Sequence, residues 1–522
     1  MEKLLCLLTV LALALALVPA CAEGPEAGDN NRVFYEIFVG SFSDSDGDGT
    51  GDLRGIIRRM DYLNDGDPDS GKSLGIEGIW LTPIFQSPSN HKYDVTDYYT
   101  IDPAFGTTED LQELIRLCHE RDVKLILDLP LNHTGDQNRW FRNFCDAHAK
   151  HNTEDPFYHF YSWISSEDPR PAGRYYRPIP GTDELYECNF SDRMPELDFD
   201  DEAVWEEVLK IAEYYLDLGV DGFRFDAAKY IYMGDNDRSV AFWEWYLEKL
   251  KQKKPDLYAV AEVWDGDGIV ERYQKAVNCF HFSTAQNEGI YAETAKGGDV
   301  NKLTRVTEKY LNHLREINPE AMNIPFLSNH DMDRAAGYLT MASGRMAMAA
   351  NLYILTPGSP FVYYGEEIGL RGSRGGADTD ANRRLKMLWG DGDTVQDPEG
   401  SDYAKQTPYS VQDLEGMGGS LLHHYRKLIA ARRANPEIAR GEYQALEFRD
   451  TKLGGFLCTW NGKTVGVFHN PTDRILTVDL KTATDQTLTE ITAVLEAIPG
   501  EGGAALEGTT LTLGSQTSAI LR

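Results

Sequence analysis

Short apolar runs that alternate with amphipathic helical patterns restrict the fold of this chain more than any other feature. We expect strands at 33–39, 76–81, 123–129, 220–225, 258–263, 278–282, 323–327 and 361–364. Helical patterns lie between them, for example at 111–121, 204–218 and 240–251. Eight strands separated by helices favour an α/β fold of the (β/α)8 TIM barrel type, although a count alone does not exclude an open doubly wound sheet.

Two segments depart from this α/β pattern. Residues 133–197 are too long for a barrel loop and are rich in aromatic, proline and charged residues, which predicts a subdomain inserted after strand 3. Beyond a helix at 421–435, apolar and polar residues alternate in runs at 443–448, 455–460, 464–468, 475–480 and 511–521. This period of two predicts a C-terminal antiparallel β-sandwich over 437–522. The barrel itself would then comprise 32–132 and 198–436.

Residues 1–20 have the features of a signal peptide for export. Lys3 precedes an apolar run over 4–18, and small residues follow it. Cys21 comes after Val18-Pro19-Ala20, a pattern similar to a bacterial lipobox, so a lipid on Cys21 would anchor the protein to the cell surface, with 21–31 as anchor and linker. The alternative is ordinary cleavage and free secretion. No later apolar run is long enough to span a bilayer.

Charge and cysteine content exclude several classes of protein. The formal net charge of −32 would repel nucleic acid and anionic membrane surfaces, which favours a neutral or cationic substrate. Outside the leader and Cys21, five cysteines remain, and Cys145 with Cys188 is a candidate disulfide pair, although spacing alone does not assign it. There is no CxxC motif or Cys/His cluster, so we expect no zinc site.

Polar and charged residues close four of the expected barrel strands. Asn132 and His133 follow the third strand, and the fifth ends in Glu262. The fourth ends in 224–226 (Arg-Phe-Asp), and the seventh is followed by 329–331 (Asn-His-Asp). Buried charges are costly unless they pair or serve a ligand, and barrel enzymes place catalytic groups at the carboxyl ends of strands. We therefore expect one site there.

The acidic residues of these four segments suit cleavage of a glycosidic bond. That reaction needs one carboxylate to attack the anomeric carbon and one protonated carboxyl to protonate the leaving oxygen. Arg224 shares a strand face with Asp226 and would favour its ionised form. Neighbouring carboxylates and a closed site would raise the pKa of Glu262 and keep it protonated.

Together these segments resemble, in order and spacing, the four signature regions of the α-amylase family of glycoside hydrolases. The likeness runs from about 33 to 436 and includes blocks at 34–39, 93–99 and 194–198. It implies a retaining enzyme that cleaves internal α-1,4 bonds of starch, glycogen or maltooligosaccharides. Ala227, after the expected nucleophile, resembles members that cut α-1,4 bonds, whereas Tyr230 replaces the His that often follows Lys229.

The resemblance also implies roles for individual residues. Asp226 would be the nucleophile, Glu262 the general acid/base, and Asp331 the carboxylate that holds sugar hydroxyls in the transition state. The substrate-binding residues would be Tyr93, His133, Arg224, Lys229 and His330.

An acidic loop after the first strand predicts a bound Ca²⁺. Carboxylates stand at every second position from Asp44 to Asp48, glycines at 47, 49 and 51 allow a tight turn, and such a density of hard oxygen donors is repulsive without a cation. The alternative is a solvated acidic turn. Similar loops in relatives imply the ligands Asp44, Asp46, Asp48, Thr50 and Asp52. The resemblance further implies a second Ca²⁺ held by Asn132 and Asp198.

Several functions of the same family stay open from the sequence. They are an oligosaccharide α-glucosidase, a cyclomaltodextrinase and a trehalose-forming isomerase, which differ in loops that sequence describes poorly. A non-catalytic glucan-binding surface protein is a further alternative, disfavoured because Asp226, Glu262 and Asp331 are all present. We expect a monomer that acts on an α-glucan.

Overall fold

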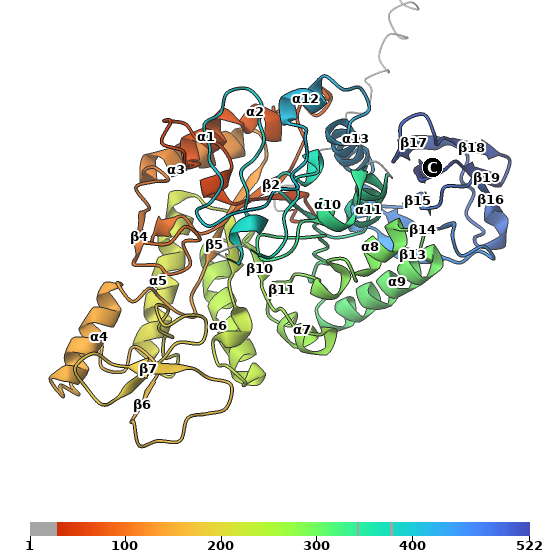
Figure 1. The fold of residues 1–522 in the computed structure, drawn as a ribbon. Helices are drawn as coiled ribbons and strands as arrows, with labels where there is room; N and C mark the ends of the chain where they lie inside the picture. The colour runs from red at the N-terminus through yellow and green to blue at the C-terminus, as the bar shows by residue number, and fades with distance from the viewer. Residues whose placement is uncertain (1–28, 342–343, 376–378) are drawn as a thin grey trace, which may run out of the picture.

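The computed structural model describes residues 29–341, 344–375 and 379–522 (Figure 1). The expected signal peptide and Cys21 lie outside the described residues. Within them, no helix is both long and apolar enough to cross a membrane.

Seven strands of the described chain form one parallel sheet, in the order β11, β10, β9, β5, β2, β1 and β12. Their bounds are β1 Phe34–Ile37, β2 Gly78–Leu81, β5 Lys124–Leu129, β9 Gly222–Phe225, β10 Tyr258–Ala261, β11 Asn278–Cys279 and β12 Phe361–Tyr363. β1 pairs in parallel with both β2 and β12, so it lies inside the sheet despite being first in the chain. A two-stranded antiparallel ribbon, β3 Phe85–Gln86 and β4 Asp97–Ile101, leaves the barrel after β2.

The expected strand at 323–327 closes the barrel without forming a regular strand. Parallel bridges join Ile324 to Phe280 on one side and Phe326 to Phe361 on the other. Pro325 between them has no N–H to donate, and its carbonyl accepts from the backbone N–H of Phe361 at 3.0 Å. The segment thus connects β11 with β12, and the (β/α)8 barrel is confirmed.

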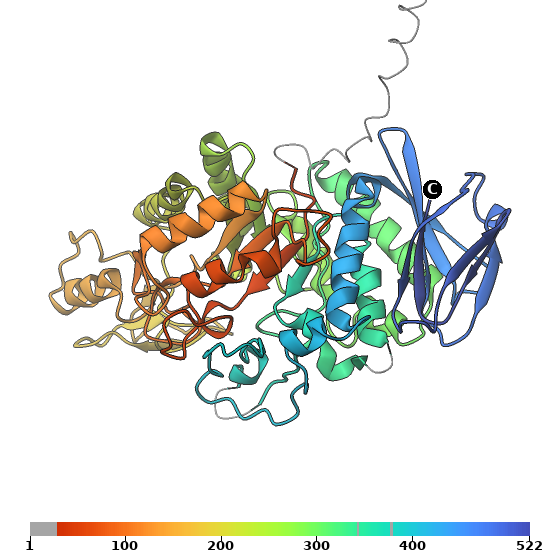
Figure 2. The same ribbon diagram turned by 90° about the horizontal axis from the view of Figure 1, so that it is seen from above.

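Helices cover the outside of the barrel (Figures 1 and 2). They are α1 Leu53–Arg58, α2 Met60–Leu63, α3 Thr108–Glu120, α5 Glu202–Leu218, α6 Asn236–Lys253, α7 Asp267–Tyr273, α8 Ile290–Ala295, α9 Val300–Ile317, α10 Ala335–Tyr338, α11 Arg345–Ile354, α12 Val411–Glu415, α13 Leu421–Arg433 and α14 Pro436–Arg440. The start of α3 is determined by its sequence, because Thr107 and Asp110 form a capping box there. Its buried residues recur with helical spacing and face the sheet: Leu111, Leu114, Ile115 and Cys118.

Large side chains fill the inside of the barrel. Phe34 stacks on Phe361 with ring centroids 4.8 Å apart, and Trp80, Tyr258 and Phe280 belong to the same buried cluster. The ring of Phe34 fits only because β2 begins with Gly78, where a Cβ would come within 2.4 Å of that ring. The barrel is therefore a packed core, and ligands are confined to its ends.

The segment after β5 carries a helix and a small sheet of its own. They are α4 Arg139–Ala149 and the strands β6 Trp163–Ile164, β7 Tyr176–Pro178 and β8 Leu185–Glu187, in the order β6, β8, β7. An antiparallel bridge from His133 to Glu196 brings the two ends of this insert together, and a second bridge joins Tyr161, in its middle, to Leu197 at its end. In both ribbon views the insert and the C-terminal strands lie at opposite ends of the molecule.

The expected disulfide between Cys145 and Cys188 is wrong, because both residues are free thiols. Burial raises the pKa of Cys145 to about 12 and that of Cys188 to about 11. Since the thiolate is the form that reacts, these thiols are poor partners for oxidation.

The C-terminal segment forms two antiparallel sheets. One has the order β13 Glu442–Leu446, β14 Gly454–Trp460, β15 Lys463–Asn470, β20 Thr517–Leu521 and β17 Ile491–Glu496, and the other has the order β16 Leu476–Asp479, β19 Thr510–Leu513 and β18 Ala504–Glu507. Leu457 and Phe468 of the first sheet share a buried cluster with Leu511 of the second. The run expected at 511–521 is two strands, because Gln516, with φ of 41°, turns the chain between them.

Candidate active site

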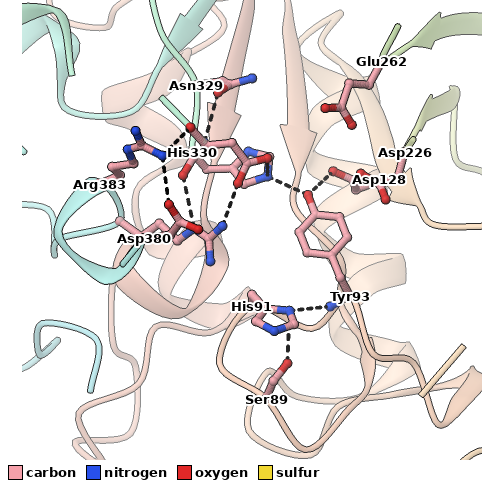
Figure 3. Close-up of polar contacts among 12 residues, drawn as sticks. Ser89, His91, Tyr93, Asp128, Asp226, Glu262, Asn329, His330, Asp380 and Arg383 are labelled. Carbon is pink, nitrogen blue, oxygen red and sulfur yellow. Dashed lines mark hydrogen bonds and ion pairs between the residues drawn. The ribbon is translucent and has the colours of Figure 1, made fainter. Parts of the chain in front are cut away.

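The charged residues expected at the strand ends meet at one end of the barrel, and Figure 3 shows Asp226, Glu262 and His330 among them. Asp128 lies in β5 and Arg224 in β9, while Asp226 and Glu262 directly follow β9 and β10. His330 and Asp331 follow the bridging segment that closes the barrel. Four stretches of chain therefore contribute to one site, as the sequence predicts.

Arg224 is the centre of this site. Its Nη1 donates to Oδ1 of Asp128 at 2.8 Å and to Oδ1 of Asp226 at 2.5 Å, while its Nη2 donates to Oε2 of Glu262 at 2.7 Å. The guanidinium is fully buried and holds three carboxyl groups from three neighbouring strands. Because its planar fork is rigid, it fixes the carboxyl groups of Asp226 and Glu262 relative to each other.

The backbone after β9 brings Asp226 and Glu262 close together. Ala227 adopts a left-handed conformation with φ of 46°, which is uncommon for a residue with a Cβ and often marks a functional site. Its N–H donates to Oε2 of Glu262 at 3.2 Å. Because both carboxyl groups also bond to the one guanidinium of Arg224, they lie side by side. Such proximity suits the roughly 5 Å separation of retaining glycosidases.

The carboxyl groups of the site have different pKa values, because their surroundings differ. Burial raises the pKa of Glu262 to about 7, with Asp226 and Asp331 adding to the shift and Arg224 opposing it. Burial also raises the pKa of Asp226, against the effect of Arg224. The pKa of Asp331 lies well below its ordinary value, because His330 and Arg384 outweigh burial. Near neutral pH the site thus offers a protonated acid, Glu262, together with an ionised carboxylate, Asp331.

Asp331 is held from two sides. Nη2 of Arg384 donates to its Oδ1 at 2.7 Å, and Nε2 of His330 lies 3.2 Å from its Oδ2. Arg384 comes from a loop far along the chain, and its Nε donates to the carbonyl of His330 at 3.1 Å. Sequence reasoning missed Arg384, because no strand or motif precedes it.

Tyr93 connects the two halves of the site. Its hydroxyl donates to Oδ2 of Asp128 at 2.9 Å and lies 2.7 Å from Nε2 of His330 (Figure 3). The rings of Tyr93 and His330 are stacked at 5.7 Å. Lys92 presents Tyr93 from a left-handed backbone with φ of 66°, anchored by a buried ion pair to Asp102 at 2.7 Å.

His133 has a ring nitrogen ready for a ligand. Its side chain is buried, and its Nε2 has no hydrogen-bond partner among the described residues. Burial lowers the pKa of His133 to about 4, so the imidazole is neutral at ordinary pH. A buried polar atom without a partner is costly, which favours a hydroxyl of a bound ligand at this place.

Aromatic side chains border the site on the side of the insert. Phe190, which is 47% exposed, contacts His133 and Tyr230 with ring centroids 5.2 and 4.9 Å away. Lys229 lies near this edge, where its Nζ donates to the carbonyl of Trp264 at 2.8 Å and to Asp265 at 3.0 Å. Exposed aromatic faces are suited to sugar rings, and sequence reasoning did not identify Phe190.

Three of the five residues that the sequence suggests as calcium ligands lie close together in the acidic loop. Carboxylate oxygens of Asp44, Asp46 and Asp48 lie within 4.8 Å of one another. Asp52 instead caps α1, accepting from the N–H of Gly55 and of Ser45, both at 2.7 Å. The backbone N–H of Thr50 donates to Asp48 at 2.7 Å. Three converging carboxylates on a glycine-containing turn fit a hard cation such as Ca²⁺.

The second calcium site stays a prediction. The side-chain amide of Asn132 contacts the buried carboxyl of Glu196, not that of Asp198. Asp198 accepts the backbone N–H of Asp200 at 2.9 Å. Burial raises the pKa of Glu196 well above its ordinary value.

A (β/α)8 barrel that carries paired carboxyl groups in this geometry at one end is the architecture of a glycoside hydrolase. The chain belongs to the α-amylase family, because it matches the alpha amylase catalytic domain over residues 36–441. It is thus an enzyme of that family of glycoside hydrolases.

Individual relatives carry more than one activity in their names. The chain is 34% identical over 454 residues to Alpha-amylase 3 of Dictyoglomus thermophilum, covering 84% of each chain. It is 31% identical over 430 residues to a cyclomaltodextrinase of Thermoanaerobacter pseudethanolicus, covering 80% of this chain and 63% of that one. Its fold is similar to that of Amy13B from Eubacterium rectale, with a TM-score of 0.86, 31% identity and coverage of 95% and 96%. Names alone therefore leave the particular reaction open.

Proposed function

We propose that this protein is a retaining α-amylase that cleaves internal α-1,4 bonds of starch, glycogen or maltooligosaccharides. The observation that carries the proposal is the contact of Arg224 with both Asp226 and Glu262, which holds an attacking carboxylate and a protonated acid side by side. The likeness to an enzyme named alpha-amylase over most of the chain supports the choice within the family.

The reaction would proceed in two displacements at one carbon. An Asp226 oxygen attacks the anomeric carbon while Glu262 gives its proton to the glycosidic oxygen, so that bond breaks and the leaving chain departs as an alcohol. Glu262, now ionised, takes a proton from water, whose oxygen attacks the same carbon. The ester to Asp226 then breaks, and both carboxyl groups return to their first state.

The surrounding residues would stabilise the sugar during both steps. Asp331, kept ionised by His330 and Arg384, accepts hydrogen bonds from two sugar hydroxyls, and these strengthen as the ring distorts. The free Nε2 of His133 binds another hydroxyl. Tyr93 offers its ring beside that of His330.

Product analysis tests the proposal directly. Soluble starch should lose its iodine colour faster than reducing ends appear, as internal cuts require, and Glu262→Gln should abolish both signals. Release of glucose from maltose without loss of colour would mean an α-glucosidase, and a strong preference for cyclic dextrins would mean a cyclomaltodextrinase. Appearance of trehalose from maltose would mean an isomerase.

We also propose that Ca²⁺ binds the loop of Asp44, Asp46 and Asp48, where it would neutralise the three carboxylates and fix the loop. The loop is held against a distant segment, since Oγ1 of Thr394 donates to Asp44 at 2.6 Å. Export and lipid attachment at Cys21 stay a prediction, which mass spectrometry of the mature N-terminus from the native host checks.

A further inference from the structure

We propose that Glu36 is a positioning residue of this active site: its carboxylate holds His330 so that the opposite ring nitrogen donates to Tyr93 and forms an ion pair with Asp331. The inference deepens the proposed hydrolase function and rests on it for its kinetic test. Glu36 lies inside strand β1, one residue before its end, whereas Asp226 and Glu262 directly follow their strands.

Glu36 is placed to hold His330 and little else. It lies in β1 on the same face as Phe34, so its side chain enters the barrel, where it is 1% exposed. Its Oε1 accepts from Nδ1 of His330 at 2.6 Å and from the backbone N–H of the same residue at 3.2 Å. One carboxylate oxygen therefore fixes both the ring and the main chain of His330.

The hydrogen bonds around the ring determine where its protons lie. The single hydroxyl proton of Tyr93 goes to Asp128 at 2.9 Å, so the oxygen of Tyr93 can only accept from Nε2 of His330 at 2.7 Å. Oδ2 of Asp331 lies 3.2 Å from the same nitrogen, which favours a positive charge on the ring. Nε2 thus carries a proton, and Nδ1 carries another because it faces the carboxylate of Glu36.

The charges around the ring agree with this doubly protonated form. Burial lowers the pKa of His330, but Asp331 and Glu36 outweigh it and raise the pKa to about 10. Asp128 adds negative charge beyond the hydroxyl of Tyr93. Two cations face the same region: Arg384 donates to the carbonyl of His330, and Arg224 opposes the rise that burial causes in the pKa of Glu36.

Loss of the Glu36 charge would weaken the binding of the sugar by Asp331, because it changes the state of His330. A neutral imidazole that keeps its proton on Nδ1 turns an unprotonated Nε2 towards the carboxylate of Asp331 and the oxygen of Tyr93. Tyr93 would lose a donor, and Asp331 would lose an ion-pair partner and be held by Arg384 alone. Because Asp331 acts most strongly on the distorted sugar, the turnover number should fall more than substrate binding.

The test is Glu36→Gln, which keeps the shape and an acceptor oxygen but removes the charge. The matched control is Glu367→Gln, since Glu367 is equally buried and accepts from the hydroxyls of Tyr35, at 2.7 Å, and Tyr62, outside the site. With a 4-nitrophenyl maltooligoside, we expect kcat of Glu36→Gln to fall about 100-fold with KM within about threefold, the size of a lost electrostatic contact in a closed site. Glu367→Gln should keep kcat within about twofold, as expected of a change away from the site.

A second measurement does not depend on catalytic activity. The nitrogen-15 shifts of the His330 ring, assigned among the twelve histidines with His330→Asn, should show both nitrogens protonated in the wild type at pH 8. In Glu36→Gln the pKa of the ring should fall. A singly protonated ring in the wild type, or a kcat of Glu36→Gln equal to that of Glu367→Gln, would overturn the proposal. A wild type inactive on every α-glucan would instead refute the hydrolase function and leave the ring measurement valid.

Discussion

Arg224 and Asp226, two residues apart at the end of one strand, are joined by a hydrogen bond of 2.5 Å between Nη1 and Oδ1. The other end of the same guanidinium holds Glu262 at 2.7 Å. The single positive charge of Arg224 therefore binds carboxyl groups from adjacent strands. It cannot neutralise all of these carboxyl groups if each of them is ionised. The arrangement leaves one of them, Glu262, with a proton near neutral pH.

Replacement of Arg224 by Lys should separate charge from geometry. An ammonium group keeps the positive charge but does not bind two carboxyl groups in a fixed plane, so kcat/KM on starch should fall by about 100- to 1,000-fold. The control is Arg426→Lys, because Arg426 makes a comparable two-point contact with Glu415 far from the site. Equal kcat/KM in the two variants would show that the fork geometry of Arg224 has no catalytic importance.

The pH dependence of hydrolysis should follow Glu262. Its pKa is raised to about 7, so the proton is present below that pH and lost as the pH rises through it. We expect kcat/KM on starch to fall on the alkaline side with a midpoint near pH 7. α-Maltosyl fluoride is the control, since fluoride leaves without a proton and its first step should lack this limb. An alkaline limb shared by both substrates would assign it to another group.

The sequence predicts the barrel and the reacting carboxyl groups because both follow local patterns. Asp226 and Glu262 come directly after apolar strands, and such positions meet at one end of a barrel. Arg384 could not be predicted in this way, because it lies in a loop 53 residues after Asp331 and does not follow a strand. Glu36 was not predicted either, because a residue inside β1 is expected to belong to the core, and only the contact with His330 shows its second role.

The errors in the predicted strands have equally local causes. At 323–327, Pro325 interrupts the hydrogen-bond ladder, so the segment closes the barrel through isolated bridges only. At 511–521, the alternation of apolar and polar residues continues through a turn at Gln516. The residue pattern does not predict the left-handed backbone of Gln516. Periodicity identifies which residues are buried more reliably than where a strand stops.

Calcium should stabilise the fold through the loop of Asp44, Asp46 and Asp48. At a free Ca²⁺ concentration 100-fold above its Kd, a single site adds about 2.7 kcal/mol, so thermal unfolding should shift upwards with Ca²⁺ and back with EDTA. Asp46→Asn with Asp48→Asn should remove the shift. The control is Asp67→Asn with Asp69→Asn, in a loop with the same alternating spacing whose carboxylates do not converge in the described structure. Equal shifts in both double variants would place the ion elsewhere.

His133 should bind substrate as a neutral group. Because burial lowers its pKa to about 4, its contribution should be constant between pH 5 and 8. His133→Ala removes a partner for one sugar hydroxyl, and we expect KM for maltooligosaccharides to rise about 10-fold, the effect of losing one buried hydrogen bond of about 1.4 kcal/mol.

A histidine in the C-terminal sheet provides the matched control. His469 is also buried, its pKa is lowered to about 3, and its Nε2 likewise has no partner among the described residues. Its Nδ1 lies 2.8 Å from the hydroxyl of Ser518, far from the barrel end that holds Asp226. His469→Ala should therefore lower the melting temperature and leave KM unchanged. If His133→Ala lowers stability in the same way while KM stays at the wild-type value, His133 is a structural residue and the subsite must be assigned to other groups.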